Sequence, residues 1–206
     1  MGASQFDLLP AIMLDQTVHR FWVSPDRQAA LLALGLDPSD AQETLQLLGA
    51  VTSAAKLNEF LNFPFRRRVA YVGPPLRFSD ANLPAFYSAI EPKTAEDEAA
   101  PRDGYTCYKD QFTCKFGGRA KDVLNTGWAF LTGKTSNDLQ ACLNIARRAK
   151  ASGIQAIKTP SAQRLGGICV PVWDRLALSE PQYVRTVRYV TDVTGRVVNV
   201  EEVQSA

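Results

Sequence analysis

The sequence predicts one α+β domain, in which helices and strands follow each other without regular βαβ repetition. Apolar residues recur at helical spacing in the first third of the chain and again over residues 136–151. Short runs typical of strands lie between and after these segments, and no internal repeat occurs. The chain has 206 residues, of which 46% are hydrophobic and 21% are charged, a composition typical of an ordinary globular protein with one core.

Residues 1–63 are predicted to be mostly helical and to cover one face of a sheet. A serine and a proline at positions 24 and 25 provide an N-cap and a first helical residue, so a helix is expected over 27–36. A second helix opens at residues 37–40, and a third covers 54–61 before a proline ends it.

Strands and a short helix are predicted in the middle of the chain. Strand-like runs occur at residues 69–72 and 83–89. Pro92 then starts a helix that carries Glu98. The signal between residues 99 and 135 is mixed, and its alternation over 105–116 is typical of a hairpin.

The next segment is predicted to be a helix followed by two strands. Residues 136–138, with the sequence Ser-Asn-Asp, cap a helix that runs to about Ala151, and Gly153 stops it. Strands are expected over 154–158 and 168–173, with a Pro-Ser loop between them.

The end of the chain is predicted to form a closing hairpin over residues 183–200. Its two halves alternate in register around a turn that ends at Gly195. We therefore expect a single domain over residues 1–206, with its motif-bearing core at 69–173 and the hairpin closing it.

Charge and cysteine spacing exclude several classes of function. The net charge of +2 is nearly balanced and lacks the electrostatic footprint of a nucleic-acid-binding protein. The run Arg66-Arg67-Arg68 is the exception, either as a solvated turn or as a contact for phosphate or a partner. Six residues separate Cys107 from Cys114, and the chain has one histidine, so no metal site is expected.

Localisation follows from what the sequence lacks. No apolar run approaches the roughly 18 residues of a membrane span, and the N-terminus carries no basic signal-peptide region. We expect a protein that acts in the cytoplasm without membrane contact; oligomerisation stays open.

A small set of side chains offers the groups needed to hold and split a dinucleotide. Arg77, Tyr87 and Glu98 are spaced ten and eleven residues apart, and they provide a cation, an aromatic face and a carboxylate. Ser161 later adds a hydroxyl next to Gly166-Gly167, where the absence of side chains would let a substrate approach the backbone.

The local sequence around these residues resembles that of the RES-domain family, which is named for its Arg, Glu and Ser. An Arg-bearing turn at Arg77 precedes a strand with Tyr87, and a helix then delivers Glu98. Residues 146–173 resemble the end of the family's domain: helix, glycine, strand, Pro-Ser loop, double glycine and final strand. The resemblance covers about residues 69–173.

The resemblance implies a fold like that of ADP-ribosyltransferases, with a central, mostly antiparallel and split sheet flanked by helices. It further implies an enzyme that uses NAD as its substrate, without a prosthetic group, and cleaves the nicotinamide–ribose bond with water or phosphate as acceptor. Such members are toxins restrained by an inhibitor protein, an antitoxin or immunity partner. Transfer of ADP-ribose to a protein, and a catalytically silent binding module, are the alternatives.

Each candidate residue has a physical role in that interpretation. The Arg77 fork would bind the pyrophosphate, and Tyr87 would stack on a flat ring. Glu98 would stabilise positive charge that develops on the ribose, and Ser161 would hydrogen-bond a phosphate or the carboxamide. Here Ala99-Ala100-Pro101 follows Glu98 where many relatives carry a histidine, so the helix should end early and Glu96 stays an alternative.

Overall fold

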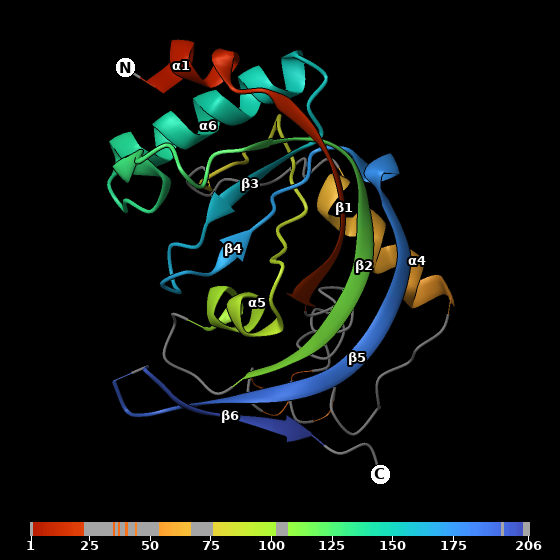
Figure 1. The fold of residues 1–206 in the computed structure, drawn as a ribbon. Coiled ribbons are helices and arrows are strands. Elements are labelled where there is room, and N and C mark those ends of the chain that lie inside the picture. Colours follow the sequence, from red (N-terminus) through yellow and green to blue (C-terminus); the bar gives the residue numbers. More distant parts are fainter. Residues whose placement is uncertain are drawn as a thin grey trace.

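Six strands in the described part of the chain form one sheet, with helices packed around it (Figure 1). The structure is a computed structural model, and it describes residues 2–22, 35, 37, 40, 44, 54–66, 76–101, 107–194 and 196–203. The strands are β1 (Ala11–Trp22), β2 (Cys107–Asp122), β3 (Ala156–Pro160), β4 (Ile168–Cys169), β5 (Leu178–Thr191) and β6 (Val197–Val203). Their order is β4-β3-β2-β5-β6, with β1 paired to β2.

β2 is the central strand, and the sheet splits along one of its edges. β1 pairs antiparallel with β2 from Asp110 to Lys121. On the opposite edge, β5 pairs antiparallel over residues 107–116 and β3 pairs parallel over 120–122. The β5–β6 half and the β3–β4 half therefore diverge beyond Phe116, which confirms the predicted α+β class with a mostly antiparallel sheet.

The hairpin predicted over residues 105–116 is wrong for the part that the structure describes. Residues 107–122 form one uninterrupted strand, and no turn occurs near Asp110. Shifts in the register between β2 and β5 at Gln111 and after Thr113 are typical of β-bulges, which bend a strand without ending it. A strongly curved strand thus produced the alternation that had indicated two short ones.

The strand predicted over residues 83–89 is also wrong as a regular strand. This segment is extended but joined only by isolated bridges: Phe86 pairs with Val172, and Ala89 pairs with both His19 and Cys169. Pro84 has no N–H to donate to a ladder, which limits regular pairing at the start of the segment. The segment nevertheless runs between β1 and β4 and connects the two halves of the sheet.

The N-terminal third contains β1, which the prediction of a mostly helical region missed. Exposure alternates along Ala11–Val18, so the period of a strand is present in this segment. Helices α1 (Gly2–Leu8) and α4 (Ala54–Asn62) flank it in sequence, and the second confirms the helix predicted over 54–61. The helices predicted over 27–36 and from 37 onward, and the strand at 69–72, lie outside the described residues.

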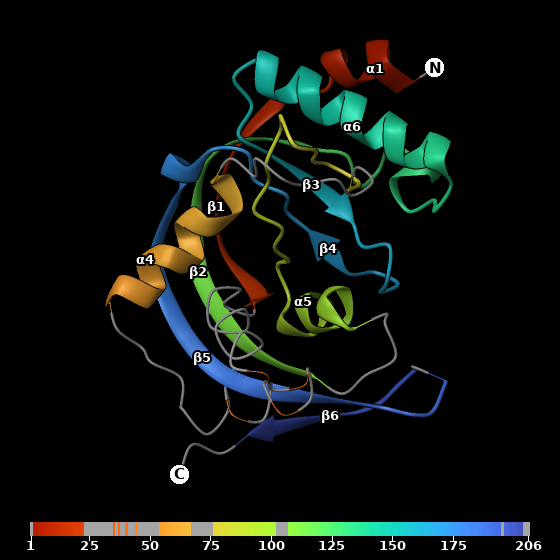
Figure 2. The same ribbon diagram turned by 180° about the vertical axis from the view of Figure 1, so that it is seen from behind.

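Helices cover the sheet at three places (Figure 2). α6 (Ser136–Ala151) lies with α1 over the β3 end, α5 (Pro92–Ala99) packs on β1 and β4, and α4 packs on β5.

α6 confirms the predicted helix, although its N-cap is Thr135, which forms a capping box with Asp138. Gly153 ends it with a φ of +69°. Three short 3₁₀ helices complete the described elements: η1 (Phe63–Phe65), η2 (Ala129–Leu131) and η3 (Arg175–Ala177).

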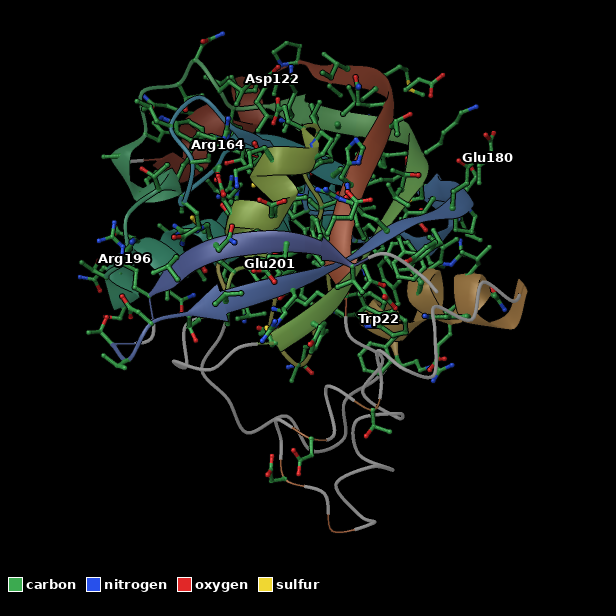
Figure 3. The ribbon with its side chains drawn as sticks, turned by 90° about the horizontal axis from the view of Figure 1, so that it is seen from below. Trp22, Asp122, Arg164, Glu180, Arg196 and Glu201 are labelled. Carbon is green, nitrogen blue, oxygen red and sulfur yellow. The ribbon has the colours of Figure 1, made fainter. Side chains whose placement is uncertain are left out.

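The C-terminal strands confirm the predicted closing hairpin. β5 and β6 pair antiparallel, and Figure 3 shows them as a long ribbon with Arg196 near their connecting turn and Glu201 on β6. Arg185 of β5 reaches the Glu96 carboxylate of α5 at 3.2 Å, so the ribbon holds the helix that carries Glu98. The strand predicted over residues 154–158 is shifted to β3, at 156–160, and the strand predicted over 168–173 is shortened to β4, at 168–169.

Candidate functional site

Arg77 lies in a tight turn and directs its guanidinium toward a second loop. Leu76 and Ser79 exchange backbone hydrogen bonds of 2.9 and 3.4 Å, which close the turn around Arg77. The Arg77 Nη1 donates to the carbonyl of Gly133 at 2.7 Å and to that of Phe130 at 3.3 Å. In this arrangement the side chain fixes the loop that leads from η2 into α6.

Tyr87 holds the same turn from the other side. Its hydroxyl accepts the backbone N–H of Phe78 at 2.8 Å and lies 3.1 Å from the Ser79 Oγ. Burial raises the pKa of Tyr87 to about 12, so the phenol stays protonated at neutral pH. The structure therefore brings Arg77 and Tyr87 to one turn.

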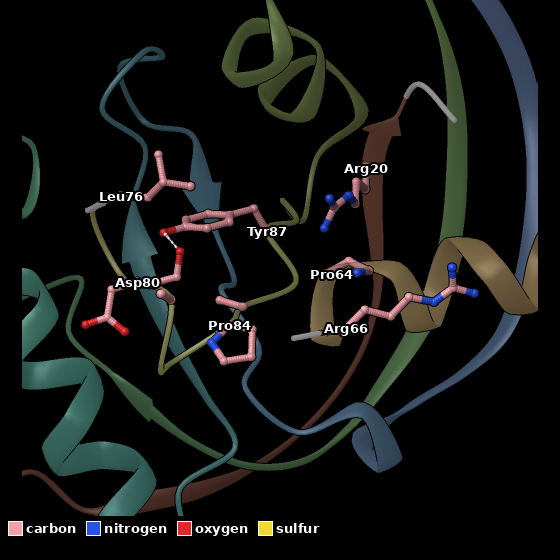
Figure 4. Close-up of a pocket in the computed structure, with 10 residues that line it drawn as sticks. Arg20, Pro64, Arg66, Leu76, Asp80, Pro84 and Tyr87 are labelled. Carbon is pink, nitrogen blue, oxygen red and sulfur yellow. Dashed lines mark hydrogen bonds between the residues drawn. The ribbon is translucent and has the colours of Figure 1, made fainter. Parts of the chain in front are cut away.

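The ring of Tyr87 forms a wall of a small hollow (Figure 4). Two guanidinium side chains, Arg20 and Arg66, line it together with Leu76 and Asp80. Its volume of about 110 Å³ suits one portion of a ligand rather than a whole dinucleotide, since pockets for drug-sized molecules span roughly 300–1,000 Å³. An aromatic face close to cations is suited to a flat ring that carries phosphate.

Glu98 and Ser161 meet at a second place. Ser161 donates its hydroxyl to the Glu98 Oε1 at 2.5 Å, and the N–H of Ala162 donates to the same oxygen at 3.0 Å. Glu98 occupies the last turn of α5, which ends at Ala99 shortly before Pro101. The early end of the helix, predicted from Pro101, is confirmed.

The Ser161 hydroxyl makes three hydrogen bonds, one to α5 and two within its own loop. Besides donating to Glu98, its oxygen accepts the N–H groups of Gln163 at 3.1 Å and Arg164 at 3.0 Å. A hydroxyl has one hydrogen to donate and two lone pairs, so none remains for a further partner. The geometry indicates that Ser161 orients Glu98, whereas the direct contact with substrate expected from the sequence stays a prediction.

Comparison with known proteins agrees with these motifs. A sequence model described as the RES domain matches residues 51–192. The chain belongs to the RES-domain family. Among solved structures it is similar to the crystal structure of the M. tuberculosis MbcT–MbcA toxin–antitoxin complex, with 15% identity, 91% of each chain covered and a TM-score of 0.51. A search of curated proteins found no match.

In this RES domain the double glycine serves the packing of the Ser161 loop. A Cβ on Gly167 would lie 2.5 Å from the Thr94 Oγ1 of α5, so only glycine fits this close approach. The Gly167 carbonyl also accepts the Ser161 N–H at 2.8 Å. Gly166 has a φ of +74°, which suits glycine for conformational reasons. Both positions thus shape the loop, while a close approach of substrate to them stays a prediction.

Glu96, the alternative to Glu98, already has structural partners. Its carboxylate is buried and pairs with Lys93 on one oxygen and with Arg185 on the other. Each oxygen of Glu96 thus has an ion-pair partner. Of the two carboxylates, Glu98 is the one with an oxygen, Oε2, that makes no hydrogen bond to a residue that the structure describes.

The predicted residues fall into two pairs, Arg77 with Tyr87 and Glu98 with Ser161. Among the described residues, no hydrogen bond or ion pair joins one pair to the other. The sequence missed Arg20, whose guanidinium lies 4.7 Å from the Phe86 ring centroid and lines the Tyr87 hollow. No pattern in the sequence indicated this residue, because Arg20 lies beyond Ala11–Val18, the part of β1 in which exposure alternates.

Two absences hold for the residues that the structure describes. No cluster of three or more His, Cys, Asp or Glu side chains there could hold a metal ion. None of the helices in that part of the chain has both the length and the apolar character needed to cross a bilayer.

Proposed function

We propose that this RES domain cleaves the nicotinamide–ribose bond of NAD and acts as a toxin that a protein antitoxin restrains. The observation that carries the proposal is the geometry of Glu98. Hydrogen bonds from Ser161 and Ala162 fix its Oε1, while its Oε2 has no hydrogen bond within the described part of the chain. A carboxylate that is fixed through one oxygen and open at the other is ready to face a developing positive charge.

The chemistry requires little more than this carboxylate. Nicotinamide leaves as a neutral molecule because it is a cation while bound, so no general acid is needed. Positive charge grows on the ribose, as in other glycosyl cleavages, and Glu98 would stabilise it. Water or phosphate would then add to the ribose carbon.

The Tyr87 hollow would hold another part of the substrate. The Tyr87 ring offers a face for nicotinamide or adenine, and Arg20 and Arg66 offer donors for the pyrophosphate. Arg77, predicted from the sequence to bind the pyrophosphate, donates to backbone carbonyls in this structure. Its contribution to binding would therefore include holding the turn that positions Tyr87.

The biological role is proposed from the family and the structural neighbour together. That neighbour is the structure of a toxin–antitoxin complex, and the present chain shares its fold over 91% of each chain. An enzyme that consumes NAD would damage the cell that makes it, so an inhibitor protein is expected. Expression of the chain alone should arrest growth, and the Glu98→Gln variant should not.

Incubation of the purified full chain with NAD tests the activity. We expect free nicotinamide together with ADP-ribose, or with its phosphate ester when phosphate is present. Glu98→Gln should abolish the release, whereas the control Glu201→Gln, at a half-exposed ion pair on β6, should not change it. Labelled protein would instead identify an ADP-ribosyltransferase, and no turnover of NAD would leave a binding module.

A further inference from the structure

Cys169 lies beside the carboxylate of Glu98. Its Sγ is 3.6 Å from the Glu98 Oε1, within the range of a thiol hydrogen bond. β4 places the residue opposite Thr159 of β3, and an isolated bridge links it to Ala89 on its other side. The backbone of Cys169 is therefore held from two directions, and its thiol has a fixed position relative to α5.

Three donors converge on one oxygen of this carboxylate. The Ser161 hydroxyl, the Ala162 N–H and the Cys169 thiol all reach the Oε1 of Glu98. They approach from different segments, since the first two belong to the loop after β3 and the third belongs to β4. Glu98 is thus held against rotation as well as against displacement.

The thiol keeps its proton and can act as a donor. Burial, and then the negative charge of Glu98, raise the pKa of Cys169 above that of an ordinary thiol. Cys169 is therefore a poor nucleophile at neutral pH, because nucleophilic attack needs the thiolate. A protonated thiol next to a carboxylate can donate a hydrogen bond to it, as Cys169 does to Glu98.

We propose that Cys169 is a positioning residue that holds the Oε1 of Glu98 and so presents the Oε2 to the ribose. The inference rests on the proposed function in one respect, namely that Glu98 stabilises the reacting ribose. It adds a residue outside the Arg-Glu-Ser set to the machinery of this chain. Its effect should appear in the chemical step and not in NAD binding.

Kinetics of matched variants test the effect on turnover. Cys169→Ala removes the donor and should lower kcat about three- to tenfold with little change in KM, as expected for one lost hydrogen bond. Cys169→Ser restores a donor and should recover most of the rate. Cys114→Ala removes a buried thiol from β2, whereas Cys169 is partly buried, and it serves as the control for loss of core volume. Equal rates in the wild type and Cys169→Ala, or equal loss in Cys169→Ala and Cys169→Ser, would overturn the inference.

The infrared S–H stretch tests the contact without relying on activity. The difference between wild-type and Cys169→Ala spectra isolates the band of this thiol, which we expect at the lowered frequency of a hydrogen-bonded S–H. Glu98→Ala should move the band to higher frequency, and an unmoved band would refute the hydrogen bond. If the wild type leaves NAD intact, the proposed function fails, while this band still decides whether Cys169 holds the carboxylate.

Discussion

The Oε1 of Glu98 and the Oγ of Ser161 lie 2.5 Å apart, although the two residues are 63 positions apart in the chain. One belongs to the last turn of α5 and the other to the loop after β3. The loop is further tied to the helix by an ion pair of 3.1 Å between Arg164 and Asp97. The carboxylate is therefore part of a rigid connection between a helix and a strand end.

Removal of the Ser161 hydroxyl should impair NAD cleavage more than stability. Ser161→Ala deletes the bond to Glu98 and the two bonds that shape the loop. A hydrogen bond to a charged group contributes about 1.5–3 kcal/mol, so we expect turnover to fall about ten- to hundredfold. Steady-state nicotinamide release measures this, with Ser179→Ala, at an exposed position of β5, as the control. A rate close to that of the wild type would contradict the orienting role.

Gly167→Ala should displace the Ser161 loop from α5. The new Cβ would lie 2.5 Å from the Oγ1 and 2.9 Å from the Cγ2 of Thr94. Overpacking of this kind costs about 1–3 kcal/mol, so both the melting temperature and the turnover should fall. Adding Thr94→Ala should restore part of each. Gly117→Ala, which meets nothing within 4 Å, should have little effect; if it matched Gly167→Ala, crowding against α5 would not be the cause.

Tyr87→Phe should change how stability depends on alkaline pH. The pKa of Tyr87 is raised to about 12, whereas the phenol of an unfolded chain ionises near its ordinary value of 10.0. Its neutral form therefore contributes stability that is complete below about pH 10 and is lost as the pH rises to about 12, on the order of 2 kcal/mol.

Urea unfolding of the wild type and of Tyr87→Phe from neutral pH to about pH 12 isolates the stability that the neutral Tyr87 contributes. The other tyrosines are common to both proteins, so their ionisation cancels in the difference. At neutral pH the variant should be less stable by about 1–3 kcal/mol, since the Phe78 N–H loses its acceptor. The difference between the two proteins should shrink above about pH 10. Two parallel curves would show that Tyr87 is not held as the neutral phenol.

Arg77→Lys should weaken the loop that the guanidinium holds. Arg77 donates to the carbonyls of Phe130 and Gly133, and a lysine lacks the planar fork that fixes its donors. We expect a loss of about 1–2 kcal/mol in the free energy of unfolding, together with reduced NAD turnover. Arg188→Lys, at a half-exposed ion pair of β5, is the matched control. Full activity in Arg77→Lys would exclude a need for the fork.

Elements with strong local signals could be predicted from the sequence. α6 has an apolar stripe, a cap at its start and Gly153 at its end. Each of these signals depends only on residues that are close together in the sequence. Pro101 likewise predicted the early end of α5. The closing hairpin followed from alternation around a turn. In these segments the preference of the local chain and the tertiary packing agree, so local chemistry was sufficient.

Elements whose form depends on distant partners could not be predicted in the same way. β1 is a strand because it pairs with β2 along its whole length, and β2 runs unbroken because β1, β5 and β3 all pair with it. The extended segment near Phe86 makes only single bridges, and these join it to Val172 and, through Ala89, to β1 and β4. Pairing across the sheet decided these conformations.

The α+β class and the RES-domain motifs follow from the sequence, and Arg77, Tyr87, Glu98 and Ser161 were predicted from it as one set. How these side chains are grouped depends on the tertiary fold. It joined Glu98 to Ser161 and directed Arg77 toward backbone carbonyls. It also brought Cys169 to the carboxylate. The physical reason is that a hydrogen bond requires two groups within about 3 Å, and the paths of α5, β3 and β4 through space set those distances.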